Sequence, residues 1–330
     1  MRAVYGNQQA QARLERAVLG DAVSHAWLLT GPAGIGKTTL ALEFARLLQC
    51  TERDRAASEP CGECLSCRKI AHGNHPDVTL IQPETGKRTL KVELVREVIR
   101  LGNLTPSEGR WRIFVIPDIE RMVLAGANAL LKTLEEPAPG VVLLLTSSEP
   151  ETLLPTVLSR CQIVPMLPLS PEDVARALTE RWGMSEHEAR ELAALANGRI
   201  GWAVRAAEKP ELREQRIHEL EEIAALATVP RDERLRRAGA FGTDVESARR
   251  VLELWMLWWR DVVLAAGGAS HLVTSGDLRS RAERLGKRLG VESSQRFLHA
   301  LLDAQLALEA NANPRLTMEV LALDLPTQPV

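Results

Sequence analysis

Eight consecutive residues, GPAGIGKT, are the part of this sequence best suited to chemistry. In the pattern G-x-x-x-x-G-K-[ST], glycine amides turn around phosphate oxygens, the lysine reaches the terminal phosphates and the threonine ligates Mg²⁺. A glycine-rich turn without a ligand is the alternative, but an apolar run before the loop and helical spacing after it favour nucleotide binding. The predicted nucleotide-binding residues are Gly31, Pro32, Ala33, Gly34, Ile35, Gly36, Lys37, Thr38 and Thr39.

A second motif, RIFVIPDIE, ends an apolar segment with a single acid where nucleotide hydrolysis needs two. One acid helps to hold Mg²⁺, and another polarises the attacking water. Asp118 can do the first job, and Ile119 cannot do the second. Glu120 would share the side of Asp118 in an extended chain, but we expect a solvated loop residue, since isolated loop acids are normally exposed. The motif predicts a chain that binds ATP or ADP with Mg²⁺ and hydrolyses it poorly or not at all.

Four cysteines lie close together in the sequence. Cys61, Cys64 and Cys67 make two consecutive C-x₂-C spacings, and Cys50 ends the helical pattern before them. Four thiolates suit a structural, tetrahedral Zn²⁺ site with no open position for catalysis. A redox C-x-x-C pair, free thiols and an iron–sulfur cluster are the alternatives. The fifth cysteine, Cys161, is expected to be a small buried hydrophobe.

Strands and helices alternate through the first half of the chain, which predicts a parallel sheet covered by helices on both faces. Helices are expected after the glycine loop, at 91–104 and at 126–137. Short helices are expected over 171–205, and everything from about 211 onward has a helical pattern, including a strongly apolar helix at 251–267. The expected strands cover residues 26–29, 77–83, 111–117 and 141–148.

Length and composition indicate a protein of two or three globular domains, since the chain has 330 residues and is 45% hydrophobic. A net charge of −2 argues against a strong standalone nucleic-acid binder. No apolar run reaches the ~18–20 residues of a membrane span, and the first residues lack an apolar targeting core. We therefore expect a cytoplasmic protein without a membrane contact.

Four segments resemble, in this order, a known family: SHAWLLTGPAGIGKTTLA, CGECLSC, NALLKTLEEP and LLTSSEPETLLPTVLSRCQ. The resemblance is to the bacterial DNA polymerase III clamp-loader subunits of the AAA+ class, and it covers almost the whole chain. Within this family the sequence is more similar to the delta prime stator type than to the gamma/tau motor type. The motor carries adjacent Asp-Glu where this chain has Asp118 and Ile119. It also carries an arginine in its small helical domain where alignment places Gly201, with Arg199 close by.

The resemblance implies a rigid partner in a ring that loads the sliding clamp onto primed DNA, with no independent ATPase activity. Its partners would be the gamma/tau and delta subunits, the sliding clamp, and primer–template DNA held by the assembled ring. The implied domains are an AAA+ RecA-like nucleotide-binding domain at 1–167 with an inserted zinc module at 50–67, a small helical lid at 168–209, and an all-helical collar at 210–330.

The resemblance also implies roles for two single residues. Arg160, in the SRC motif, would act in trans as an arginine finger on the ATP of the neighbouring subunit. Such a guanidinium stabilises charge in the transition state. Thr146 would face the nucleotide as a polar sensor. The ordinary alternatives are a surface ion pair for Arg160 and a strand-end threonine for Thr146.

Two other functions fit parts of the sequence. A gamma/tau-like motor would hydrolyse ATP itself and use Glu120 as the polarising acid. A P-loop enzyme such as a small-molecule kinase would need an acceptor pocket lined by polar groups, and nothing in the sequence marks one. The long helical second half fits assembly better than it fits a small-molecule enzyme.

Overall fold

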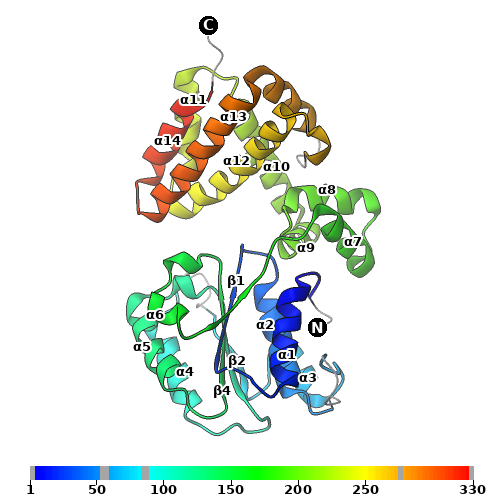
Figure 1. The fold of residues 1–330 in the computed structure, drawn as a ribbon, viewed down its shortest axis with the longest axis vertical. Coiled ribbons are helices and arrows are strands. Elements are labelled where there is room, and N and C mark those ends of the chain that lie inside the picture. Colours follow the sequence, from blue (N-terminus) through cyan, green and yellow to red (C-terminus); the bar gives the residue numbers. More distant parts are fainter. Residues whose placement is uncertain (1–3, 53–58, 83–88, 274–277, 327–330) are drawn as a thin grey trace. The chain divides into compact units, whose positions relative to one another are not determined.

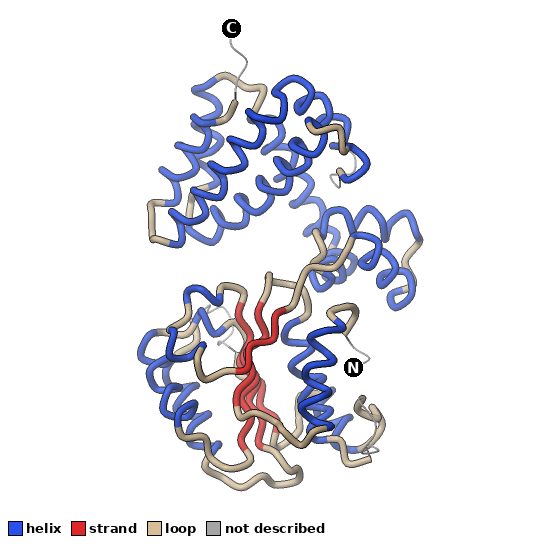
Figure 2. The backbone as a smooth tube through the Cα atoms, viewed as in Figure 1, coloured by secondary structure: helices blue, strands red, loops and turns tan. Residues whose placement is uncertain are grey.

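The computed structural model describes residues 4–52, 59–82, 89–273 and 278–326 (Figures 1 and 2). The chain divides into two compact units. Unit 1 consists of Met1–Ala177 and Gly198–Trp202, and unit 2 consists of Leu178–Asn197 and Ala203–Val330. The three-domain boundaries expected from the sequence stay a prediction.

Unit 1 is built on a five-stranded parallel sheet with the strand order β2-β3-β4-β1-β5. Every residue of β1, β3 and β4 is buried, as continuous apolar runs dictate for parallel strands covered on both faces. This confirms the predicted α/β P-loop fold. The strands are β1 Ala26–Thr30, β2 Val78–Leu80, β3 Arg112–Ile116, β4 Val141–Ser147 and β5 Gln162–Pro165.

Helices cover both faces of this sheet (Figure 1). Helices α1 and α2 pack on one face through residues such as Leu14 and Phe44. Helices α4 and α5 pack on the other face through residues such as Val98 and Leu130. The helical elements of unit 1 are α1 Gln8–Leu19, α2 Lys37–Gln49, α3 Leu65–Ala71, α4 Val92–Gly102, η1 Ile119–Arg121, α5 Leu124–Glu135, η2 Pro150–Thr152 and α6 Pro155–Leu158.

The remaining elements are all helical among the described residues. Helix α7 begins in unit 1 and ends in unit 2, and the first turn of α9 belongs to unit 1. The core of unit 2 is centred on Trp255, Trp259 and Phe297, which join α12 to α13. These elements are α7 Pro171–Trp182, α8 Glu186–Ala196, α9 Ile200–Glu208, α10 Pro210–Leu226, α11 Arg231–Phe241, α12 Val245–Ala266, η3 Ser270–Leu272, α13 Arg279–Glu309 and α14 Pro314–Asp324.

The expected strands and helices are confirmed. The sequence patterns missed four further elements, α1, α3, α6 and β5, together with the 3₁₀ turns, and the apolar helix expected at 251–267 begins earlier, at Val245. Position 83, the end of one expected strand, lies outside the described residues. None of the helices in the described part of the chain combines the length and apolar content needed to cross a bilayer.

Candidate nucleotide site and cysteine cluster

The glycine loop connects β1 to α2 at the carboxyl end of the sheet. Gly31 has φ 137° and Gly36 has φ 99°, both outside the range that other residues readily adopt. A β-carbon on Gly31 would lie 2.3 Å from the carbonyl oxygen of Met166, whereas a β-carbon on Gly36 would meet nothing within 4 Å. The loop is therefore packed tightly against Met166, the residue after β5, at its start and is open where α2 begins, as a phosphate cradle requires.

Lys37, the first residue of α2, is buried with 5% of its surface exposed. Its ammonium donates hydrogen bonds to the carbonyl oxygens of Gly31 (2.7 Å) and Pro32 (3.0 Å) and to Oγ of Ser148 (2.9 Å). All three acceptors border the loop. A phosphate in the loop would offer Lys37 charged acceptors in exchange for these neutral ones, and charge-assisted hydrogen bonds are the stronger kind.

The groups around Lys37 shift its pKa in opposite directions. Burial lowers the pKa of Lys37, while the carboxylates of Asp118 and Glu120 raise it and the guanidinium of Arg199 lowers it further. Two acids and one arginine are thus close enough to Lys37 to act on its charge. Positive charge from Lys37 and Arg199 suits a phosphate, and negative charge from the two acids suits the Mg²⁺ that accompanies it.

The end of β3 turns in a way that the sequence did not predict. Asp118 adopts the left-handed conformation, with φ 48°, and the 3₁₀ turn η1 follows it. The backbone N–H of Asp118 donates to Oγ1 of Thr146, 3.1 Å away, and Thr146 is fully buried. The chain is therefore not extended here, and Ile119 is turned into the core beneath α5.

Glu120 is not the solvated loop residue that we expected, and that expectation is wrong. Its Oε1 accepts a hydrogen bond from the backbone N–H of Ser148 at 3.0 Å. Its Oε2 is buried and has no hydrogen-bond partner in the described part of the chain. The turn after Asp118 carries the side chain inward because the backbone reverses there. Glu120 therefore belongs to the candidate nucleotide site.

Sequence reasoning also missed Ser148, which links Lys37 to Glu120 through its hydroxyl and its backbone N–H. Its place at the end of an expected strand, two residues after Thr146, is the one signal that could have identified it. Gly201, expected where a motor carries its arginine, lies beside the loop, and its N–H donates to the carbonyl oxygen of Gly34 at 2.7 Å. A β-carbon on Gly201 would lie 2.9 Å from that oxygen.

These residues fit a bound nucleotide and magnesium ion. The open cradle at Gly36 and the buried, unpaired Oε2 of Glu120 are the two features that a phosphate with its cation would satisfy. Thr38 is half-buried on the first turn of α2, beside Lys37, whereas Thr39 is exposed. A nucleotide in this loop would supply phosphates for Lys37 and the backbone amides to bind.

Arg160 follows α6, and its side-chain contacts with described residues are with Thr156, Ser159 and Glu135. Its Nη1 donates to the carbonyl oxygen of Thr156 (3.0 Å) and to Oγ of Ser159 (3.2 Å). Its Nη2 forms an ion pair with Oε1 of Glu135, at the end of α5, at 2.8 Å. The side chain keeps 35% of its surface exposed, so the guanidinium remains accessible to another molecule. The surface ion pair and the finger role are compatible with this geometry.

The four clustered cysteines are brought together as the spacing predicts. Their sulfur atoms all lie within 4.8 Å of one another, and the sulfurs of Cys61 and Cys67 are 4.0 Å apart. Tetrahedral Zn²⁺ with Zn–S bonds of about 2.3 Å needs sulfurs ~3.8 Å apart, so the set fits zinc. Backbone N–H groups of Cys61, Cys64 and Cys67 donate to the sulfurs of Cys50, Cys61 and Cys64 respectively. Donors of this kind favour thiolates.

The pKa values of these thiols are shifted in different directions. Burial raises the pKa of Cys50 and of Cys67. Burial also acts to raise the pKa of Cys64, but hydrogen bonds from Cys67 and Thr51 outweigh it and lower that pKa to about 6. Cys161, by contrast, lies in the sheet core, where burial raises its pKa to about 12. The expectation of a small buried hydrophobe is confirmed.

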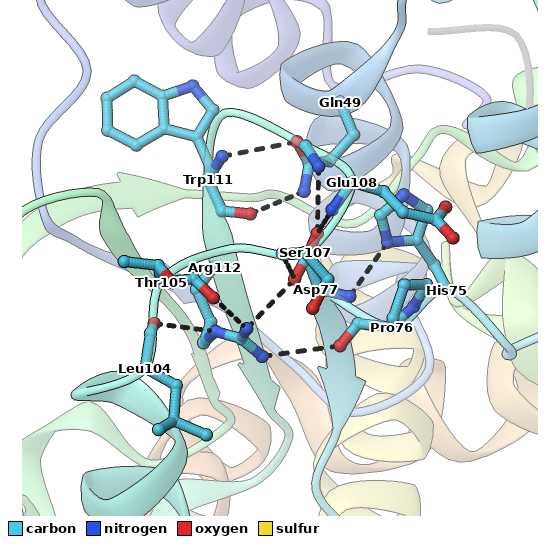
Figure 3. Close-up of polar contacts among 11 residues, drawn as sticks. Gln49, His75, Pro76, Asp77, Leu104, Thr105, Ser107, Glu108, Trp111 and Arg112 are labelled. Carbon is cyan, nitrogen blue, oxygen red and sulfur yellow. Dashed lines mark hydrogen bonds and ion pairs between the residues drawn. The ribbon is translucent and has the colours of Figure 1, made fainter.

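A polar network lies at the amino end of β3 (Figure 3), and Ser66 links it to the cysteine cluster. Ser66, next to Cys67, shares a hydrogen bond of 3.0 Å with Nε2 of His75, and Nδ1 of His75 accepts from the N–H of Asp77 at 3.1 Å. The carboxylate of Asp77 is fully buried and pairs with Arg112 at 3.1 Å. These contacts join α3 to β2 and β3.

The Asp77 carboxylate also organises the loop before β3. It accepts hydrogen bonds from the backbone N–H groups of Ser107 (2.7 Å), Glu108 (2.7 Å) and Gly109 (2.9 Å). Burial acts to raise the pKa of Asp77, but these three donors and Arg112 outweigh it and lower the pKa below its usual value. Every oxygen of this buried carboxylate is satisfied, which identifies the network as structural.

The sheet order and the glycine loop after an interior strand define an α/β protein of the P-loop class. Comparison with known proteins narrows this class. Residues 6–170 match the family described as "DNA polymerase III, delta subunit". The chain is 30% identical to DNA polymerase III subunit delta' of Bacillus subtilis (strain 168) over 320 residues, 94% of each chain.

Two further curated relatives are also DNA polymerase III subunits. The chain is 41% identical to subunit delta' of Pseudomonas aeruginosa over 179 residues, 53% of each chain. It is 33% identical to subunit tau of Bacillus subtilis over 159 residues, 48% of this chain and 27% of that one. A gamma subunit-related protein from Thermotoga maritima has 20% identity and a TM-score of 0.42, covering 96% of this chain and 98% of that chain. The chain belongs to the DNA polymerase III delta-subunit family.

Proposed function

We propose that this chain is a delta prime-like stator subunit of a DNA polymerase III clamp loader, which places the sliding clamp on primed DNA. The observation that carries the proposal is the position of Ile119. The residue after Asp118 in a motor would be the water-activating glutamate, whereas Ile119 is 6% exposed and packs in the core. The chain then keeps a phosphate cradle without the usual hydrolytic acid.

The proposed nucleotide role is binding rather than turnover. The amides of the glycine loop and the ammonium of Lys37 would hold phosphates, with Thr38 and Asp118 directed to Mg²⁺ and Thr146 bracing the Asp118 turn. Lys37→Ala should abolish binding of a fluorescent ATP or ADP analogue. Lys132→Ala, on α5, serves as the control and should bind normally. Equal binding by both variants would contradict the nucleotide role.

Arg160 would serve the ATP of the neighbouring subunit. Its guanidinium is partly exposed and held by a surface ion pair, so it can leave Glu135 at little cost. Arg160→Ala should lower ATP turnover of a reconstituted loader by about 10³-fold at the affected site, because that is the scale of arginine fingers. Arg100→Ala, which removes another surface-paired arginine of unit 1, should leave turnover unchanged. Normal turnover with Arg160→Ala would refute the finger role.

The helices of unit 2 would form the assembly surface. A groove between α13 and α14 is lined partly by Ala304, Ala307, Leu316 and Val320, and Leu316 and Val320 are each more than half exposed. Gamma/tau and delta subunits are the proposed occupants, in a collar. Leu316→Asp with Val320→Asp should remove the chain from a pull-down with these subunits. Leu272→Asp, an exposed apolar position elsewhere in unit 2, should not.

A structural Zn²⁺ is proposed for the cysteine cluster. Elemental analysis of the purified chain should find about one zinc per chain, and Cys64→Ser should lose it. Cys161→Ser removes a thiol outside the cluster and should retain the zinc. A fully folded, zinc-free wild-type protein would contradict this part of the proposal.

A second candidate function, a gamma/tau-like ATP-hydrolysing motor, is favoured by the inward position of Glu120. A carboxylate with a buried, unpaired oxygen near Lys37 could polarise water in place of the missing acid. This motor would turn over ATP by itself, and Glu120→Gln would abolish the activity. The stator predicts no turnover by the isolated chain above that of Lys37→Ala.

A further inference from the structure

The first half of α13 carries exposed cations that no role proposed above uses. Arg279, at its start, pairs with Glu283 at 3.2 Å, as solvated helix charges commonly do. Four further cations make no ion pair with any residue of the described chain. We call these four residues the basic strip: Arg281, Arg284, Lys287 and Arg288.

The helix holds the basic strip on one side. Members three, four and seven residues apart share a helix face, and the strip spans eight residues, or about 10 Å along the helix axis. Arg284, Lys287 and Arg288 are exposed. The opposite side is buried: a β-carbon on Gly286 would lie 2.7 Å from the carbonyl oxygen of Val262 in α12. Close packing of α13 on α12 therefore fixes the strip in position.

The positive charge ends at a break in the helix. Gly290 has φ 74°, so two helical segments meet there. Residues 279–289 contain five cations and one acid, whereas residues 291–309 contain one cation, Arg296, and three acids. Arg296 is paired with Glu292 at 3.1 Å. In a chain of net charge −2, unpaired cations gathered in one segment indicate a surface for a polyanion.

We infer that the basic strip binds the phosphate backbone of DNA. Duplex DNA carries one negative charge per ~1.7 Å of its axis, so a strip of about 10 Å can face several phosphates at once. Arginine, which makes up three of the four members, binds phosphate through two parallel hydrogen bonds. The choice of DNA over another polyanion rests on the proposed role in a clamp loader, whereas the polyanion surface itself does not depend on that role.

The test measures binding of the full-length chain to a labelled 20-base-pair duplex between 50 and 200 mM salt. The wild type should lose about 100-fold in affinity over this range, because four phosphate contacts give a slope near −3.6 on logarithmic axes. The triple variant Arg284→Ala, Lys287→Ala, Arg288→Ala should reduce that slope by about three units. The matched control removes three paired, exposed arginines, Arg176, Arg190 and Arg296, and should keep the wild-type slope.

Any of the following three results would overturn the inference that the basic strip binds DNA. No binding at 50 mM salt, or equal slopes for the triple variant and the control, excludes a DNA contact at the strip. Binding of a poly-glutamate peptide but not of DNA, lost in the triple variant, would make the partner an acidic protein. If the triple variant is no longer recovered in a pull-down with gamma/tau and delta, the strip is a subunit interface. The proposed function is tested separately, because the triple variant should support normal ATP turnover of the loader in the absence of DNA.

Discussion

Two arginines of unit 1, Arg112 and Arg160, make ion pairs of similar length in very different surroundings. Arg112 lies 3.1 Å from Asp77, and the two side chains are 7% and 0% exposed. Arg160 lies 2.8 Å from Glu135, and these side chains are 35% and 49% exposed. The shorter distance therefore belongs to the weaker interaction, since solvent screens exposed charges. Burial, and not distance, separates a structural arginine from one that is available for function.

The partners of each guanidinium strengthen this contrast. Arg112 also donates to the carbonyl oxygens of Leu104 and Thr105, so it is held by backbone on several sides (Figure 3). Among the residues that the structure describes, Arg160 donates, besides the pair with Glu135, only to Thr156 and Ser159 of its own turn. Releasing Arg112 would leave buried groups unsatisfied, whereas water can replace every partner of Arg160.

The largest expected effect is that of Asp77→Asn. The variant leaves Arg112 buried without its counter-charge and faces an amide toward backbone N–H groups. We expect the free energy of unfolding to fall by about 3–5 kcal/mol, measured by urea denaturation. Asp21→Asn, whose partner Arg110 is exposed, should change it by no more than about 0.5 kcal/mol. Equal losses in the free energy of unfolding for Asp77→Asn and Asp21→Asn would contradict the distinction between buried and exposed ion pairs.

A smaller, pH-dependent effect follows from the same carboxylate. The pKa of Asp77 in the folded protein is below its usual value of 3.8, chiefly because backbone donors and Arg112 outweigh burial. Its stabilisation is therefore fully present above pH 3.8 and is lost as the pH falls through the lower folded-state pKa. Denaturation curves should show the wild-type advantage over Asp77→Asn shrinking below pH 3.8. An advantage that grows there would contradict the assignment.

The smallest effect belongs to the exposed pair. Glu135→Gln should lower the free energy of unfolding by no more than about 1 kcal/mol, because both partners are well solvated. Glu97→Gln, which disrupts the exposed pair with Arg100, provides the matched reference in the same denaturation experiment. A loss of more than about 2 kcal/mol for Glu135→Gln alone would show that Arg160 is a structural residue.

The parts of the site that the sequence predicts are those built from local patterns. The glycine loop lies between one strand and one helix. The C-x₂-C spacings place three of the four cysteines in helix α3 or in the few residues just before it. Contacts that join distant residues were not predictable. Glu120 reaches Ser148 across 28 positions, and Asp77 reaches Arg112 across 35.

The missed elements have local causes. The inward turn of Glu120 depends on the left-handed conformation of Asp118, which an extended-strand assumption excludes. Strand β5 was missed because three of its four residues are exposed, so it lacks the continuous apolar run of the interior strands. The pairing of β5 with β1 fixes its place in the strand order of the sheet, which the sequence alone does not give.

The central claim is that this chain acts on the ATP of a neighbour and not on its own. The most direct test compares ATP turnover of reconstituted loaders that contain this chain as wild type, Arg160→Ala or Glu120→Gln. The account predicts that Arg160→Ala sharply lowers turnover and Glu120→Gln leaves it at the wild-type rate. Full turnover with Arg160→Ala together with loss in Glu120→Gln would contradict it.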